Sequence, residues 1–394
     1  MIPFREALDL LLQHTPVLGT ERCRIEEAVG RVLRQEIRAD RAFPSFDRVM
    51  MDGYALRSID LGACASFRIA GSAPAGAPTI ALSGEVGACV EVMTGAPLPS
   101  GADCIVPVEE ITRISPDEIR ISPLYEFLPG KFIHRAGSDA AEGEVLMEAG
   151  RWLGSREIGV AASCGAAWIE VARQPLIRVL ATGDELVAVD EVPAAHQIRQ
   201  SNAHAISSAL RRAGHAVAGI GTLGDDVAAA REQLEQTLVS SDWLVLTGAV
   251  SKGARDFIPG LLDSLGCQRI FHGIAQRPGK PAGCWIGPTG QVIVALPGNP
   301  VSALTGLHAF VLPALGKALG VTVRPPRMVV PDGRINGLEG MTLHLPVVLG
   351  EDGRAQAAPS GNSGDFIGLL RSDGFITLPP RGGTSLAFPF TPWL

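Results

Sequence analysis

The stretch that decides the fold is PLIRVLATGDEL, residues 175–186. Residues 176–181 are apolar apart from Arg178, and the polar, glycine-containing run 182–185 follows at once. A short apolar run that ends in such a turn is typical of a strand buried on both faces in a parallel sheet. We therefore expect an α/β fold around this segment.

The same alternation continues downstream. The pattern predicts strands over residues 216–220, 243–246, 269–274 and 292–296, and helices over 202–214, 225–239, 256–266 and 300–319. Strands that alternate with helices of this length predict βαβ units and a mostly parallel sheet. This places an α/β domain at residues 173–322.

The flanking segments have a different pattern. Residues 39–144 contain short apolar runs between Gly, Pro and Asp turns, which is typical of an all-β domain. Helices are predicted over residues 4–12 and 24–34, so we expect residues 1–172 to form a β domain (39–144) inserted in a helical linker (1–38 and 145–172). Two prolines at 325 and 326 precede a C-terminal β domain, residues 325–394. The predicted fold class is α/β multidomain.

Composition excludes several classes of protein. The 394 residues have a net charge of −7, which disfavours nucleic acid as a partner. The seven cysteines are widely spaced without a CxxC pair, which disfavours a disulfide framework or a zinc site. The N-terminus lacks a signal-peptide apolar region, and no apolar run approaches ~18 residues. We expect a cytoplasmic protein with no membrane partner.

An anion-binding loop is predicted at TGAVSKGARD, residues 247–256. Ligands of open α/β sheets bind outside the carboxyl ends of the strands. Here Gly248 and Gly253 permit close backbone approach, and Ser251 and Lys252 supply donors. The helix expected from Asp256 would point its positive end at the loop. An ordinary turn between strand and helix stays an alternative, because neither a Walker loop nor GxGxxG is present.

Three acids, Glu185, Asp225 and Asp256, each follow a different predicted strand. Carboxylates gathered at one sheet edge repel each other unless a cation lies between them. Hard oxygen ligands of this kind suit Mg²⁺ that bridges phosphates. The alternative for Asp225 and Asp256 is that each caps its own helix.

The β segment contains three further motifs: FDRVMMDGYA at 46–55, MTGAPLPSGAD at 93–103 and HRAGSD at 134–139. From residue chemistry alone, a turn explains each of them better than a site does.

Six motifs taken in order resemble the MoeA/gephyrin E-domain family, the molybdopterin molybdenumtransferases. They are DGYA from Asp52, MTGAP from Met93, RAGSD from Arg135, ATGDEL from Ala181, PGKP from Pro278 and LPGNPVS from Leu296. The segments SGNSG at 360–364 and SDGFI at 372–376 resemble the family's C-terminal domain. The resemblance covers nearly the whole chain.

The resemblance implies a central molybdopterin-binding domain, an inserted β domain and a C-terminal domain like a small β-barrel. It implies a Mg²⁺-dependent reaction in which adenylyl-molybdopterin and molybdate give Mo-molybdopterin and AMP. It also implies a homodimer, with each active site between the central domain of one subunit and the β domain of the other. Molybdopterin adenylyltransferase and molybdoenzyme maturation factors are the expected partners.

The resemblance also assigns residue roles. Catalytic roles fall on Asp52, Thr94, Asp139, Glu185, Asp225 and Asp256, of which the last three are the expected metal ligands. The expected substrate-binding residues come from the loop at 247–256 and from the PGKP and LPGNPVS motifs: Gly248, Ser251, Lys252, Gly253, Arg277, Lys280, Pro297, Asn299, Pro300 and Ser302.

The chain departs from the family pattern at charged positions. Arg277 replaces the usual Lys before PGKP, and Gly273 lies where some members have another Lys. Lys252 replaces a Val: either it restores the charge missing at Gly273, or it is a solvent-exposed Lys without effect. These departures keep one alternative open, a non-catalytic cofactor-binding carrier or insertion partner, although the five retained acids argue against it. A second alternative is an enzyme that adenylylates molybdopterin, as the related single-domain proteins do, which the N-terminal and C-terminal domains disfavour. The residues do not distinguish molybdate from tungstate.

Overall fold

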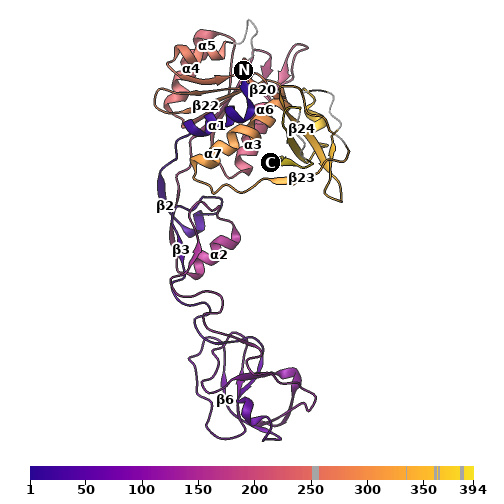
Figure 1. Cartoon of the computed structure of the whole chain (residues 1–394). Helices are drawn as coiled ribbons and strands as arrows, with labels where there is room; N and C mark the ends of the chain where they lie inside the picture. The colour runs from indigo at the N-terminus through magenta and orange to yellow at the C-terminus, as the bar shows by residue number, and fades with distance from the viewer. Residues whose placement is uncertain (251–256, 334, 359–361, 363, 382–385) are drawn as a thin grey trace. The chain divides into compact units, whose positions relative to one another are not determined.

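The computed structural model describes residues 1–250, 257–333, 335–358, 362, 364–381 and 386–394 (Figure 1). The chain divides into two compact units. The first contains Met1–Arg34, Ala149–Gly154 and Trp168–Leu394, and the second contains Gln35–Glu148 and Ser155–Ala167. The predicted ligands Ser251, Lys252, Gly253 and Asp256 lie outside the described residues.

A six-stranded sheet in the order β17-β14-β18-β22-β21-β19 is the centre of the first unit. Its strands are β14 (Ile177–Thr182), β17 (Val217–Leu223), β18 (Trp243–Thr247), β19 (Gln268–His272), β21 (Gly283–Ile286) and β22 (Val292–Leu296). The first four in spatial order pair in parallel, and β21 pairs antiparallel with both of its neighbours, β22 and β19. The prediction of a mostly parallel sheet is therefore confirmed.

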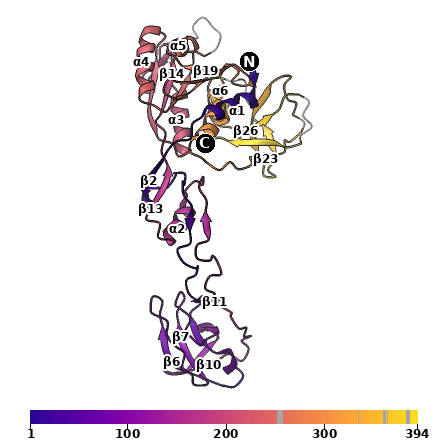
Figure 2. The same cartoon turned by 60° about the vertical axis from the view of Figure 1, so that its left-hand side comes forward.

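Helices cover both faces of this sheet (Figure 2). They are α1 (Phe4–His14), α3 (Asn202–Arg212), α6 (Pro300–Gly306) and α7 (Leu312–Ala318) on one face, and α4 (Val227–Val239) and α5 (Ile258–Ser264) on the other. Val245 packs with the first group and its neighbour Leu246 with the second, because successive strand side chains point to opposite faces. Burial on both faces explains the continuous apolar runs in the sequence.

The predicted helix over 300–319 runs from Pro300 to Ala318 and has a π-helical turn at Leu307–Val311. Its length and apolarity match those of a membrane span, but 72% of its most apolar window is buried inside the protein. It is therefore a core helix of the first unit.

A second, seven-stranded sheet lies in the same unit, in the order β1-β20-β24-β26-β27-β23 with β25 beside β24. Its strands are β1 (Ile2–Pro3), β20 (Ile274–Arg277), β23 (Arg327–Val329), β24 (Thr342–Leu349), β25 (Ala355–Ala357), β26 (Gly374–Leu378) and β27 (Phe388–Pro392). The single strand predicted over 269–274 was wrong. It is two strands, of which β19 belongs to the α/β sheet and β20 to this second sheet.

The helix predicted over residues 24–34 was also wrong. Only Ile25–Glu27 forms a 3₁₀ turn, between the strand β2 (Thr20–Arg24) and a turn at Gly30, whose φ is +75°. The next residues pair with distant segments, with Leu33 bridging Val171. Strand β2 itself pairs with β13 (Trp168–Ala172). Tertiary pairing has here overridden a helical pattern of apolar residues.

The second unit has a six-stranded sheet in the order β8-β5-β7-β6-β10-β9. The strands are β5 (Gly53–Leu56), β6 (Phe67–Ala73), β7 (Ala88–Val92), β8 (Cys104–Pro107), β9 (Ile111–Ser115) and β10 (Glu118–Ile121). Two short pairs, β4 (Arg48–Val49) with β11 (Ile133–His134) and β3 (Ile37–Arg38) with β12 (Val145–Met147), accompany it, as does the helix α2 (Ser155–Ser163).

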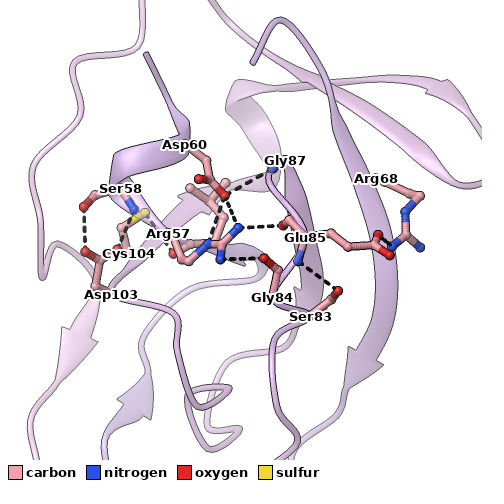
Figure 3. A network of polar contacts seen from close by, with 11 residues as sticks. Arg57, Ser58, Asp60, Arg68, Ser83, Gly84, Glu85, Gly87, Asp103 and Cys104 are labelled. Atoms are coloured by element: carbon pink, nitrogen blue, oxygen red, sulfur yellow. Dashed lines mark hydrogen bonds and ion pairs between the residues drawn. The ribbon is translucent and has the colours of Figure 1, made fainter. Parts of the chain in front are cut away.

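A buried polar network holds one end of this sheet (Figure 3). Asp60, 4% exposed, accepts hydrogen bonds from Arg57 at 2.7 and 3.0 Å and from the backbone N–H of Gly87 at 3.2 Å. Arg57 also donates to the carbonyls of Gly84 and Glu85. The guanidinium and carboxylate are thus paired with each other and with backbone groups, as buried charges require.

Candidate functional site

The carboxyl ends of the central parallel strands are joined by side-chain hydrogen bonds. Thr182, the last residue of β14, donates through its hydroxyl to the Thr247 carbonyl at 3.3 Å. Thr247, the last residue of β18, donates to the Pro297 carbonyl at 3.0 Å. Gly248 follows with φ +97°, and a Cβ there would lie 2.5 Å from Thr182 Oγ1. The chain therefore needs glycine at position 248.

Asn202 connects α3 to the same edge. Its Nδ2 donates to Thr247 Oγ1 at 3.1 Å and to the Gly298 carbonyl at 2.7 Å. Its Oδ1 is buried and accepts no hydrogen bond from the part of the chain that the structure describes. Sequence reasoning missed this residue. Its position as the first residue of a helix near a sheet edge was the signal that could have found it.

Glu185 and Asp225, two of the predicted acids, follow β14 and β17, whose carboxyl ends are adjacent in the sheet. The Asp225 backbone N–H donates to Asp184 Oδ1 at 2.9 Å, so Asp184, which was not predicted, connects the two turns. Asp226, not Asp225, caps α4, because its carboxylate accepts from the N–H groups of Ala228 and Ala229. The capping alternative for Asp225 is therefore wrong.

The third predicted ligand, Asp256, is not described. Among the described residues, no group of three or more His, Cys, Asp or Glu side chains is placed to hold a metal ion. The carboxylates of the exposed Glu185 and the half-buried Asp225 have the donor chemistry that Mg²⁺ requires, so the described part of the predicted set fits this ion.

A cavity of 660 Å³ lies between the PGKP loop, the start of α6 and the C-terminal sheet. Five predicted substrate-binding residues line it: Arg277, Lys280, Pro297, Asn299 and Ser302. Arg277 and Lys280 are exposed, whereas Ser302 is 4% exposed on the first turn of α6. Another predicted residue, Pro300, begins α6 and is not among the lining residues. The cavity thus offers two cations and a hydroxyl.

The second unit brings its three motifs together around the segment 47–52. Asp52 accepts from Thr94 through the backbone N–H at 2.7 Å and the hydroxyl at 2.8 Å. These two bonds, that of the backbone N–H first, hold the pKa of the Asp52 carboxyl below its usual value. The predicted pair Asp52 and Thr94 is therefore in direct contact.

Asp139 lies on the loop after β11. Its Oδ1 is 2.7 Å from His134 Nε2 and 3.1 Å from Ser138 Oγ, and the hydrogen bond from His134 is the main cause that lowers its pKa. Arg48 donates to His134 Nδ1 at 3.1 Å, so Nε2 carries the ring proton. His134 thus holds Asp139, and Arg48 holds His134. Neither residue was among the predicted site residues.

Comparison with known proteins shows the family of the chain. Residues 2–165 match the family model described as MoeA N-terminal region (domain I and II), and residues 178–317 match the probable molybdopterin binding domain. A Synechocystis protein named molybdopterin molybdenumtransferase is 33% identical over 402 aligned residues that cover all of both chains. The chain belongs to the MoeA family.

Two further relatives extend the match. Molybdopterin molybdenumtransferase 2 of Mycobacterium tuberculosis is 35% identical over 78% of this chain and 77% of its own. The crystal structure of a MoeA protein of Pyrococcus horikoshii superposes with a TM-score of 0.78 at 26% identity, covering 99% of this chain and 98% of that one. The MoeA multidomain α/β fold expected from the sequence is confirmed.

One departure from the MoeA pattern has a structural reason. Gly273 has φ +88°, in the left-handed region that a lysine rarely adopts. A lysine here would require a different local backbone. That Lys252 supplies the positive charge missing at Gly273 stays a prediction, because residue 252 is not described.

Proposed function

We propose that the chain transfers molybdenum from molybdate to adenylylated molybdopterin and releases AMP. Membership of the MoeA family makes it a transferase of molybdenum cofactor biosynthesis. We assign molybdopterin binding to residues 173–322, in agreement with the family model over 178–317. The N-terminal region, residues 1–172, and the C-terminal β domain, residues 325–394, would complete the site.

The cavity beside the PGKP loop is the observation that carries this proposal. Its 660 Å³ is within the ~300–1,000 Å³ of small-molecule sites. Arg277 and Lys280 supply positive charge where a phosphate or molybdate oxygen would lie, and charge-assisted hydrogen bonds are the strong ones. Cleavage of a phosphoanhydride depends more on cationic groups and positioning than on a covalent nucleophile.

We propose Mg²⁺ as the cofactor, held by Glu185, Asp225 and Asp256. When bound, it would neutralise the phosphate oxygens of the adenylylated substrate. The chain's own residues would orient that substrate: Arg277 and Lys280 from the cavity, and Gly248 through close backbone approach. Ser251, Lys252 and Gly253 are proposed to continue this backbone cradle.

We further propose a cytoplasmic homodimer in which Asp52, Thr94 and Asp139 of one subunit complete the site on the other. The resemblance to the MoeA family carries this proposal. Inside the second unit, Asp52 contacts Thr94 and Asp139 contacts His134, so each acid is held by residues of its own unit. Molybdopterin adenylyltransferase, which would supply the substrate, and molybdoenzyme maturation factors are the proposed partners.

Incubation with adenylyl-molybdopterin, molybdate and Mg²⁺, with AMP release measured, tests this function. Release that depends on both molybdate and Mg²⁺ supports the transferase. Tight binding of molybdopterin without any AMP release would instead indicate the non-catalytic carrier, which the change to Arg277 motivates. A parallel reaction with tungstate determines the oxyanion preference.

A further inference from the structure

Two buried polar side chains link the C-terminal sheet to the PGKP loop. Gln276 on β20 and His344 on β24 are each 1% exposed, and their strands are parallel neighbours. Gln276 Nε2 donates to the Gly279 carbonyl at 3.3 Å. His344 Nε2 lies 3.3 Å from Gln276 Oε1, and His344 Nδ1 lies 3.0 Å from Thr377 Oγ1 on β26. A continuous chain of hydrogen bonds thus ends at the loop.

The direction of each bond in this chain is determined. A backbone carbonyl only accepts, so the amide nitrogen of Gln276 faces Gly279 and its oxygen faces His344. That oxygen also only accepts, so His344 Nε2 carries the proton. Burial lowers the pKa of His344 to about 3, so the ring is neutral and Nδ1 accepts from the Thr377 hydroxyl.

The surroundings hold this pair in place. The rings of Phe4 and Phe375 pack edge-on against His344 at centroid distances of 4.8 and 5.4 Å. Gly279 has φ +93°, and a Cβ there would lie 2.7 Å from Gln276 Nε2. The loop backbone therefore lies directly against the Gln276 amide.

We propose that Gln276 and His344 are positioning residues that hold the loop 277–280 so that Arg277 and Lys280 meet the substrate oxyanion in the cavity. The inference rests on the proposed function for the identity of that oxyanion. Arg277 and Lys280 lie on either side of the Gly279 carbonyl that Gln276 holds. Arg277 also pairs with Leu343 of β24. Two further backbone bonds hold the loop, from Ile274 N–H to the Lys280 carbonyl and from Ala282 N–H to the Gly279 carbonyl. Loss of the Gln276 bond would therefore loosen the loop without unfolding it.

The test compares His344→Phe, Gln276→Met and His344→Gln with the wild-type chain. Phe keeps the ring shape without the hydrogen bond, whereas Gln places an amide nitrogen near the position of Nε2. In AMP release, His344→Phe and Gln276→Met should raise KM for molybdate about tenfold, the effect of one hydrogen bond, with kcat within about twofold. His344→Gln should restore most of the affinity. Partial misfolding would instead lower kcat and leave KM unchanged.

Amide hydrogen exchange of residues 277–283 provides a readout that needs no turnover. Exchange should become faster in His344→Phe and Gln276→Met and stay near the wild-type rate in His344→Gln. Unchanged exchange in both apolar variants, or faster exchange with unchanged KM, overturns the proposal. If His344→Phe does not fold, Thr377→Val is used, with a smaller rise in KM expected and an unchanged KM counting against the proposal.

If the wild-type chain releases no AMP, the proposed function is contradicted, but the positioning role of Gln276 and His344 can still be tested. Calorimetric titration with molybdate alone would then replace the kinetics. Equal affinities of the wild type and Gln276→Met would overturn the positioning role. A weaker affinity in both Gln276→Met and His344→Phe, with His344→Gln near the wild type, would support it.

Discussion

Asp52 accepts two hydrogen bonds from a single residue, Thr94, which lies 42 positions away in the sequence. One donor is the backbone N–H and the other is the hydroxyl, and both bind Asp52 Oδ1. Both bonds favour the ionised carboxylate, which is why the pKa of Asp52 is lowered. Two motifs that a linear reading treats as separate turns are therefore one structural feature.

Replacement of Thr94 by Val removes the hydroxyl bond and leaves the backbone bond. The pKa of Asp52 should rise toward its usual value. In an acid titration, the Thr94→Val variant should therefore protonate Asp52 at a higher pH than the wild type does. NMR titration of labelled Asp carboxyl carbons measures this, with Thr94→Ser as the control that keeps the hydroxyl. If Asp52 acts as a carboxylate in catalysis, the acid limb of kcat/KM moves to higher pH in Thr94→Val only. An unmoved titration would show that the hydroxyl contributes nothing.

The shared active site can be tested by mixing two inactive chains. Asp52→Ala and Asp225→Ala affect different units of the chain, so a mixed dimer would contain one site with both acids intact. Co-expressed and purified as a heterodimer, the two variants should recover a substantial part of the AMP release of one wild-type site. A chain that is monomeric by light scattering, or a proven heterodimer with no recovery, would contradict the shared site.

The neighbours Asp225 and Asp226 form a matched pair for the Mg²⁺ proposal. Asp225→Asn should weaken AMP release and raise the Mg²⁺ concentration needed for half-maximal rate, with little effect on the unfolding temperature. Asp226→Ala removes the cap of α4 and should lower the unfolding free energy by about 0.5–2 kcal/mol without changing the Mg²⁺ response. A wild-type Mg²⁺ response in Asp225→Asn would remove this acid from the metal site.

Gly248 and Gly290 have nearly the same positive φ, +97° and +94°, but different surroundings. A Cβ at Gly248 would meet Thr182 Oγ1 at 2.5 Å, whereas a Cβ at Gly290 has no heavy atom within 4 Å. Both alanine variants should lose about 1 kcal/mol of stability from backbone strain. Gly248→Ala should lose more than Gly290→Ala, because its Cβ clashes with Thr182. Only Gly248→Ala should also lower kcat/KM, because it displaces the strand ends at the site. Equal activities of the two variants would show that this close approach does not matter for turnover.

The buried Arg57–Asp60 pair should stabilise the second unit strongly. Asp60→Ala leaves a guanidinium that is only 25% exposed without its carboxylate, which typically costs about 3–5 kcal/mol. The exposed pair Arg68–Glu85 is the control, and Arg68→Ala should change stability by less than about 1 kcal/mol. Chemical denaturation followed by circular dichroism measures both. Similar losses in the two variants would contradict the role of burial.

The sequence by itself determined the α/β class of the first unit and the polar turns at the ends of its strands. Strands buried on both faces require continuous apolar runs, and the turns that follow them are polar because they are exposed to solvent. Residues 176–185 show both properties, so the α/β sheet and the polar turn with Glu185 at its carboxyl edge were predictable. Gly248 was predictable for a similar reason. Few residues other than glycine adopt its positive φ, so a glycine in a turn after a strand indicates such a backbone.

Only the tertiary structure decided which distant segments meet. Backbone hydrogen bonds are alike for every strand, so no local pattern could show that β20 leaves the α/β sheet and pairs with β24. For the same reason the contact between Gln276 and His344, 68 residues apart, was invisible in the sequence. The apolar spacing over residues 24–34 fitted a helix, yet Leu33 pairs with Val171. Long-range pairing overrides local preference because packing and a complete set of backbone hydrogen bonds outweigh the small free-energy differences in helix propensity.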